Sequence, residues 1–333
     1  MQPVPQSLWQ RFLVCPVDRT ELTFATNEYV CCNGHRYSVV ESVPVMLAEN
    51  LVPTHPACEA TKHIVRQKSL SKGPCTIRCE ESAIDPFVQD EIVRTCGNMY
   101  RHLKGRLTRY PIPDDLPDLL PHGGGQRWFL EVGSNWGRWS IAAAQYGYQV
   151  IALDPSLEAI LAMRRVAHQL GVTIMAVVAD ARQLPLRDHS IDVAFSYSVF
   201  QHFDKPSACA AIAEMARVTK AKGIVLVQMA NRYGIRQLIN ACRQKIRRDH
   251  NPFRVRYWTP RELRTTFERI VGPVELLVDG FFSLNPRRAD IDLMPWHYAT
   301  LIRCSEYLKG MARRIPALTQ MADSLWIRAT VDA

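Results

Sequence analysis

The sequence predicts an α/β fold built on a mostly parallel sheet. Short apolar stretches alternate along the chain with segments of helical periodicity, and each apolar stretch ends in polar residues. This alternation is typical of β-α-β units, whose strands lie parallel. Ligands of such sheets bind beyond the carboxyl ends of the strands, so polar residues at these ends predict a binding site. The expected strands are residues 129–132, 149–153, 174–179 and 191–195, and the expected helices are 157–170 and 208–219.

The first expected strand leads into a turn that contains two glycines. Glu131 is the last acidic residue of the strand, and Gly133 and Gly137 enclose Ser134 and Asn135. Gly133 permits a tight turn, and Gly137 lets the following helix pack close to the strand. A third glycine is commoner where Asn135 stands, but asparagine tolerates a left-handed backbone. We therefore expect the turn to keep its shape.

The charge of Glu131 indicates which ligand this turn accepts. A carboxylate here repels the pyrophosphate of a dinucleotide, whereas S-adenosylmethionine (SAM) has no phosphate and carries an ammonium and a sulfonium group. Short glycine motifs also occur in α/β proteins that bind other nucleotides or none, so the motif alone leaves those alternatives open. Asp154 ends the second strand, where a ribose-binding carboxylate belongs. The two carboxylates together favour SAM.

Taken in order, these strand ends resemble those of the class I SAM-dependent methyltransferases, over residues 86–333. The resemblance implies a Rossmann-like sheet of seven mostly parallel strands with helices on both faces, the further strands being 223–229, 274–282 and 325–330. It also implies roles for individual residues. Those of the methionine-side loop are Glu131, Gly133, Ser134, Asn135 and Gly137; Asp154, with Pro155 beside it, binds ribose, Asp180 with Ala181 reaches adenine, and Ser196 with Tyr197 begins the loop that faces the methyl group.

The first fifty residues follow a different pattern. Cys15 and Asp18 are separated by two residues, as are Cys32 and His35. Two such turns can place four ligands around zinc. Residues 8–48 resemble the small zinc-ribbon family that accompanies methyltransferases, which implies a β-rich ribbon module over 1–50 with structural zinc. The family usually has cysteine where Asp18 stands, and a carboxylate weakens a soft-ligand site. A metal-free ribbon and Cys31 as a substitute ligand are therefore alternatives.

Three further segments complete the expected organisation. Residues 51–85 are rich in Pro, Ser, Lys and Cys with weak periodicity, which predicts a linker before the domain at 86–333. An amphipathic helix is expected from residue 86, lying over the cofactor cleft and ended by the prolines at 111–113. Residues 231–258 predict a basic helical insertion. Its part 234–248 is either a solvated surface or a site for an anionic membrane surface, a phosphate-bearing acceptor or RNA. Residues 283–322 predict helices that form a lid over the acceptor or simply pack on the sheet.

Composition limits the location of the protein. The chain of 333 residues carries a net charge of +9, and its ten cysteines are spread along it. No apolar run approaches the roughly 20 residues that span a bilayer, and the first residues lack the apolar stretch of a signal peptide. We therefore expect a cytoplasmic protein with reduced cysteines and no transmembrane segment.

The sequence narrows the acceptor without identifying it. The residues after the fourth strand contain neither the Asn/Asp-Pro-Pro-aromatic run that serves base amino groups nor a Pro-Cys pair, so those nucleic-acid methyltransferases are disfavoured. We favour methyl transfer to a small-molecule or lipid-linked acceptor by in-line displacement. Methylation of rRNA or tRNA and a non-catalytic scaffold are the alternatives.

Two residues are candidates for catalysis. For a hydroxyl acceptor His202 is the candidate base, because histidine titrates near neutrality, and Tyr197 is a candidate for orienting the acceptor. Alternatively, His202 only packs at a helix start.

Overall fold

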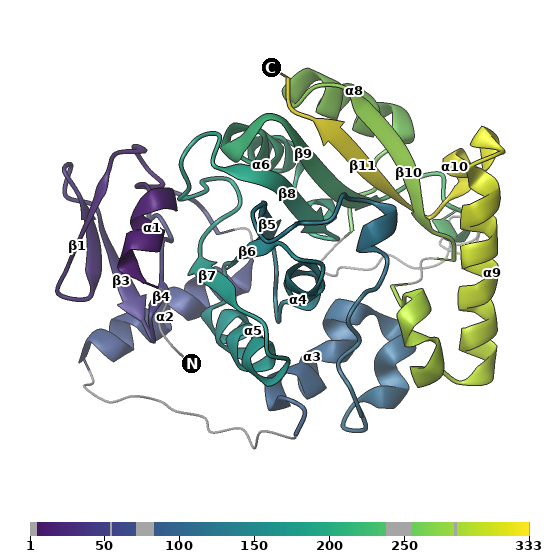
Figure 1. Ribbon diagram of the computed structural model, residues 1–333, viewed down its shortest axis with the longest axis horizontal. Coiled ribbons are helices and arrows are strands. Elements are labelled where there is room, and N and C mark those ends of the chain that lie inside the picture. The colour runs from purple at the N-terminus through teal and green to yellow at the C-terminus, as the bar shows by residue number, and fades with distance from the viewer. Residues whose placement is uncertain (1–4, 54, 71–82, 238–254, 283–284, 333) are drawn as a thin grey trace.

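The computed structural model describes residues 5–53, 55–70, 83–237, 255–282 and 285–332 (Figure 1). A seven-stranded sheet with strand order β10-β11-β9-β8-β5-β6-β7 forms the centre. Every neighbouring pair from β9 to β7 is parallel, and β11 lies antiparallel between β9 and β10. The predicted Rossmann-like sheet is therefore confirmed. Its strands are β5 (Trp128–Val132), β6 (Gln149–Asp154), β7 (Ile174–Val178), β8 (Ile191–Tyr197), β9 (Thr219–Ala230), β10 (Val274–Gly280) and β11 (Ser324–Thr330).

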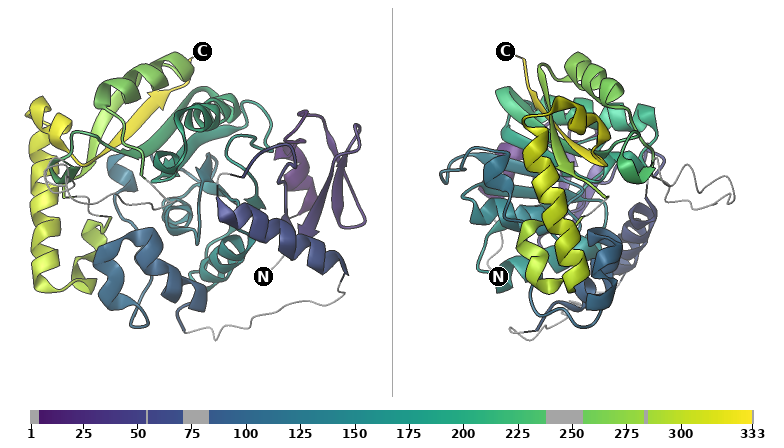
Figure 2. Two further views of the ribbon diagram at one scale, coloured as in Figure 1. Left: turned by 180° about the vertical axis from the view of Figure 1, so that it is seen from behind. Right: turned by 90° about the vertical axis from the view of Figure 1, so that its right-hand side faces the viewer.

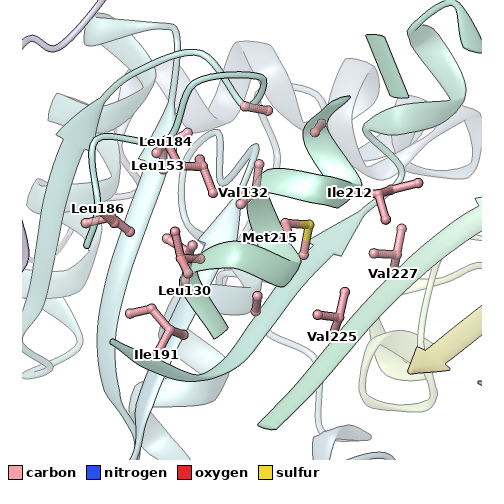
Figure 3. Close-up of a cluster of buried hydrophobic side chains, with 14 of the residues drawn as sticks. Leu130, Val132, Leu153, Leu184, Leu186, Ile191, Ile212, Met215, Val225 and Val227 are labelled. Carbon is pink, nitrogen blue, oxygen red and sulfur yellow. The ribbon is translucent and has the colours of Figure 1, made fainter. Parts of the chain in front are cut away.

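Helices cover both faces of this sheet. All five residues of β5 are buried, as expected for a central strand of a parallel sheet. Successive side chains point to opposite faces, so Leu130 and Val132 join one apolar cluster while Phe129 joins the other. Figure 3 shows the first cluster, in which Ile212 and Met215 of a covering helix pack over the strands. The main helices are α4 (Arg138–Gln145), α5 (Leu157–Gln169), α6 (Lys205–Val218) and α8 (Pro260–Ile270).

The N-terminal residues form a small antiparallel sheet, so the predicted β-rich module is confirmed. Its strand order is β1-β2-β3-β4, and it packs beside the edge strand β7 (Figure 1). Val45 bridges Val178 of β7, and the Met46 amide donates to the Val178 carbonyl at 2.7 Å. Pairing of this kind satisfies the open edge of the larger sheet. The module consists of α1 (Gln6–Phe12), β1 (Leu22–Ala25), β2 (Glu28–Cys31), β3 (Arg36–Val40) and β4 (Val43–Pro44).

The segment expected to be a linker contains a helix. Helix α2 (Pro56–Leu70) contacts α5. The next helix, α3 (Pro86–Cys96), begins where the sequence predicts, because Asp85 caps it by accepting from the Phe87 amide at 2.9 Å. It ends well before the prolines at 111–113, at Gly97 with φ 99°, and the chain continues as η1 (Asn98–Leu103). The shorter α3 follows from this glycine, whose left-handed backbone terminates the helix.

The C-terminal part carries the helices expected between the last two strands. They are η5 (Arg288–Leu293), α9 (Trp296–Ala312) and α10 (Pro316–Met321). The basic insertion expected at 231–258 lies largely outside the described residues, which end at 237 and resume at 255. Within the described ranges, every helix is too short or too polar to cross a bilayer.

Candidate functional site

The glycine turn after β5 has the backbone that its sequence requires. Gly133, Asn135 and Gly137 have φ values of 80°, 48° and 83°, so the prediction that Asn135 tolerates a left-handed backbone is confirmed. A Cβ at Gly133 would lie 2.3 Å from a methyl carbon of Val199. A Cβ at Gly137 would lie 2.1 Å from Met163 of α5, so this glycine lets the turn approach α5. Larger residues at either position would displace the turn.

Asp154 at the end of β6 holds this turn in place. Its Oδ2 accepts from the Asn135 amide at 2.8 Å, and its Oδ1 accepts from the Ser156 amide at 2.9 Å. The amides of Gly133 and Ser134 donate to the carbonyl of the residue before Asp154. Burial raises the pKa of Asp154 to about 6 in spite of these amides. A carboxylate oxygen accepts more than one hydrogen bond, so Asp154 retains capacity for ligand hydroxyls.

Glu131 lies within electrostatic reach of Asp154. Its carboxyl accepts a hydrogen bond from the Ser140 hydroxyl at 2.5 Å. Burial, with a smaller contribution from the negative charge of Asp154, raises the pKa of Glu131 to about 8. Two buried carboxyls that oppose each other's ionisation favour a cationic neighbour, because its positive charge stabilises both.

Ser134 supplies an observation that points to a ligand. Its side chain is buried, and its hydroxyl has no hydrogen-bond partner among the described residues. A buried hydroxyl left unpaired costs about 1–3 kcal/mol, so such groups commonly face a ligand or ordered water. The amino and carboxyl groups of a methionine moiety are suitable partners. The unpaired hydroxyl and the two carboxyls therefore fit SAM.

Two of the residues assigned by resemblance have partners within the chain. Asp180 accepts hydrogen bonds from Arg182 Nε at 2.9 Å and Nη2 at 2.8 Å, and Ala181 beside it is buried. The Ser196 hydroxyl donates to the Val132 carbonyl at 2.9 Å. These contacts give both residues structural roles at the sheet edge, and their proposed contacts with adenine and the methyl group stay predictions.

Sequence reasoning missed the contribution of α2 to this edge. The Thr61 hydroxyl donates to the Pro155 carbonyl at 2.8 Å and accepts from the Leu157 amide at 3.0 Å. Cys58 is buried on the same helix, and burial and the charge of Asp180 raise its pKa to about 11. Proline at the first helical position, followed by Cys58, Thr61 and Val65 at helical spacing, was the available signal. The helix therefore covers the end of β6.

Comparison with known proteins identifies the fold of this region. Residues 130–227, which span β5 to β9, match the family described as a methyltransferase domain. These residues, with the seven-stranded sheet around them, therefore have the fold of a methyltransferase domain.

Individual relatives cover only part of the chain. A malonyl-[acyl-carrier protein] O-methyltransferase of Hamiltonella defensa is 29% identical over 137 residues, which are 41% of this chain and 50% of the relative. The enzyme of the same name from Serratia marcescens is 32% identical over 126 residues, which are 37% of this chain and 45% of the relative. This chain therefore spans about half the length of these curated relatives. A solved SAM-dependent methyltransferase from Methanosarcina mazei aligns over 67% of this chain and 99% of its own, with 15% identity and a TM-score of 0.46.

The two candidate catalytic residues of the methyltransferase domain lie after and at the end of β8. His202 ends the short helix η3 (Phe200–His202), and burial lowers its pKa to about 4, helped by the charges of His55 and Arg256. Its imidazole is therefore neutral at physiological pH, but it is a weaker base than the histidine titrating near neutrality that the sequence predicted. The Tyr197 hydroxyl is buried without a partner in the part of the chain that the structure describes. Their catalytic roles stay predictions.

The module beside the methyltransferase domain gathers four candidate metal ligands. Donor atoms of Cys15, Asp18, Cys31 and His35 all lie within 4.8 Å of one another. His35 Nδ1 lies 3.2 Å from Asp18 Oδ2, 3.3 Å from Cys31 Sγ and 3.5 Å from Cys15 Sγ. Tetrahedral zinc with bonds of about 2.0–2.3 Å requires ligand separations of about 3.3–3.8 Å, so the donors fit zinc.

The cluster contains Cys31, the alternative ligand, and does not contain Cys32. Alternate residues of a strand face opposite sides, and in β2 the side chain of Cys31 points inward. Cys32 follows directly and is exposed. A gap of two residues before His35 selects Cys32, but the strand register selects Cys31.

Proposed function

We propose that this protein transfers the methyl group of SAM to a small-molecule or lipid-linked acceptor. The observation that carries the proposal is the sheet edge at which Asp154 holds the glycine turn while the Ser134 hydroxyl stays buried and unpaired among the described residues. The malonyl-[acyl-carrier protein] O-methyltransferases named above support an acceptor that bears an acyl group on a carrier, with oxygen as the methylated atom.

The side chains of this edge bind and position rather than react. Bound SAM supplies an electrophilic methyl group on its sulfonium. Asp154 holds the ribose hydroxyls, and Glu131 and Ser134 fix the methionine end. Lining up an acceptor for in-line displacement and excluding water then accounts for much of the acceleration. For a hydroxyl acceptor, the neutral His202 takes the departing proton.

Contacts of Arg287 support the proposal that the helical segment predicted at 283–322 acts as a lid over the acceptor. Arg287, just before η5, is buried and pairs with Asp279 at 2.6 Å and with Asp115. Its guanidinium lies 5.8 Å from the ring centre of Tyr197. The segment is thereby anchored to the end of β10 and to Tyr197, the last residue of β8. We propose that this lid, rather than the N-terminal module, determines which acceptors enter.

Calorimetry on the purified chain tests the cofactor. We expect SAM to bind and NAD not to bind, and we expect Asp154→Ala to lose SAM binding. Asp188→Asn serves as the control, because Asp188 is a half-exposed carboxylate paired with Arg217 away from the turn. Uptake of NAD in place of SAM overturns the proposal, and absence of both supports the scaffold reading.

Labelled SAM identifies the acceptor class. Protein is incubated with cell extract and SAM labelled in its methyl group, and RNA, protein and organic-soluble fractions are counted separately. Label in the organic or carrier-protein fraction supports the proposal. Label in RNA, together with RNA binding that weakens steeply with salt, selects the RNA alternative instead.

We also propose that the N-terminal module holds one structural zinc ion through Cys15, Asp18, Cys31 and His35. Asp18 is oriented for this role, since Thr20 donates to its Oδ1 at 2.7 Å and Asn33 donates to its Oδ2 at 2.8 Å. Hydrogen bonds to a ligand from outside the metal site fix its direction. Elemental analysis near one equivalent of zinc supports the site, and a value near zero removes it.

A further inference from the structure

Helix α9 presents an unusual outer surface. It lies at the end of the molecule opposite the N-terminal module, and no helix or strand of the described residues lies against its outer side (Figures 1 and 2). Ala299, Ile302 and Ser305 face the protein and are buried. Four residues at helical spacing run along the opposite side: Trp296, Thr300, Arg303 and Tyr307.

The aromatic residues of this line are almost fully in solvent. Trp296 is 80% exposed and Tyr307 is 70% exposed. The outer side of a helix in a water-soluble domain is normally polar. Of the eight large hydrophobic residues that are exposed in the described part of the chain, five lie between 296 and 321. Single exposed hydrophobic residues are ordinary, but this concentration on one segment indicates a contact surface. The five are Trp296, Leu301, Tyr307, Ile315 and Met321.

The same segment carries excess positive charge. Residues 294–322 contain four basic residues and one acidic residue. The acidic residue, Glu306, lies 3.9 Å from Lys309, and Lys309 is itself buried beside Asp115. Arg303, Arg313 and Arg314 are exposed and form no ion pair with any described residue. We call these three arginines and the five exposed hydrophobic residues, which lie on α9, on α10 and on the turn between them, the α9 surface.

We propose that the α9 surface binds an anionic lipid membrane. Tryptophan and tyrosine favour the boundary between water and acyl chains, where one end of the side chain is apolar and the other is wet. Arginines near the membrane surface attract anionic head groups. Trp296 and Tyr307 are eleven positions apart, about 16 Å along the helix, so the helix can lie flat with both rings at one depth.

The chemistry of the surface favours lipid over RNA. RNA rewards the arginines and stacks on aromatic rings, but it offers nothing to the aliphatic Leu301, Ile315 and Met321. A lipid surface rewards all three kinds of side chain. The proposal goes beyond methyl transfer and does not depend on it, since the α9 surface contains none of the residues assigned to the cofactor.

Vesicle sedimentation with the full chain tests this proposal. Vesicles of phosphatidylcholine alone are compared with vesicles that also contain phosphatidylglycerol, at low and at high salt. We expect sedimentation with the anionic vesicles only, weakened by salt. The double variant Trp296→Ser with Tyr307→Ser should bind at least about tenfold more weakly, because both interfacial anchors are lost. Arg303→Glu with Arg314→Glu should abolish the preference for anionic lipid.

The controls separate binding from folding and from other surfaces. Val52→Ser removes a side chain that is 81% exposed on a different segment and should bind as wild type does. All variants should unfold at the wild-type temperature, because the altered side chains are exposed. Failure of the wild type to sediment, wild-type sedimentation by the Trp296 and Tyr307 variant, or displacement of the protein from vesicles by RNA at equal charge would each overturn the proposal.

Discussion

Short motifs predicted two sites, one at the carboxyl ends of the central strands (the cofactor edge) and one in the N-terminal module. The structure brings the predicted residues together in different ways at these two sites. At the cofactor edge, the topology of the sheet brings the carboxyl ends of β5, β6, β7 and β8 together. A residue at a strand end is therefore near the site, whichever face of the sheet its side chain lies on. In the module, a ligand must lie on the correct side of a four-residue strand, so Cys31 replaces the expected Cys32. Topology tolerates an error of one residue, and strand register does not.

The sharpest test of this contrast compares the two adjacent cysteines. Cys31→Ser removes a ligand from the cluster, whereas Cys32→Ser changes an exposed side chain. We expect elemental analysis to show zinc falling from about one equivalent to near none in Cys31→Ser and staying unchanged in Cys32→Ser, since three ligands hold zinc far more weakly than four. Equal zinc content in the two variants would show that the register does not choose the ligand.

Asp154 tests the cofactor edge in the same manner. Asp154→Ala removes acceptors for ribose and also releases the Asn135 and Ser156 amides. The two hydrogen bonds that we propose between Asp154 and the ribose hydroxyls are charge-assisted, and each is worth about 1.5–3 kcal/mol. Their loss predicts SAM affinity at least about 100-fold weaker, which calorimetry measures. Asp188→Asn is the matched control. Unchanged affinity in Asp154→Ala would place the cofactor elsewhere.

The raised pKa of Asp154 predicts a pH dependence of SAM binding. The folded apo protein binds this proton more tightly than the unfolded chain, because the pKa rises from 3.8 to about 6 on burial. The resulting contribution to stability is therefore present below about pH 4 and is lost as the pH rises through 6. The affinity for cationic SAM depends on pH in the opposite direction, because binding requires the ionised carboxylate of Asp154.

We accordingly expect SAM affinity to rise about tenfold as the pH increases from about 5 to 7. Asp154→Asn should lose this step, and calorimetry on both proteins across the range measures it. The same slope in both proteins would assign the titration to another group.

The smallest expected effect concerns α2, which the sequence predicted as linker. Thr61→Val keeps the shape of the side chain and removes the hydroxyl that joins the Pro155 carbonyl to the Leu157 amide. We expect a loss of about 1–2 kcal/mol in the free energy of unfolding, measured with denaturant. Thr265→Val, at an exposed position of α8, is the control. Equal stability of the two variants would mean that α2 does not fasten the end of β6.

The sequence could predict the sheet because apolar residues recur with different periods in strands and in helices, and these periods can be recognised in the sequence alone. It also predicted the left-handed backbone at Asn135, which is a local property of the residue. The signal for α2 in the sequence, Pro56 followed by Cys58 and Thr61 at helical spacing, was too short to reveal the helix without its contact with α5. The structural partners of Asp180 and Ser196 were equally inaccessible, since Arg182 and Val132 become available only through folding.

By itself, therefore, the amino-acid sequence determined the order of strands and helices along the chain, the glycine turn and the residue types at each strand end. These depend on periodicity, backbone preference and charge, which act between near neighbours. Only the tertiary structure decided which cysteine faces the candidate metal site, that the segment after the module covers the end of β6, and that one side of α9 leaves its aromatic residues in water. Each of these is a matter of which surfaces meet, and that is fixed by packing between residues far apart in the chain.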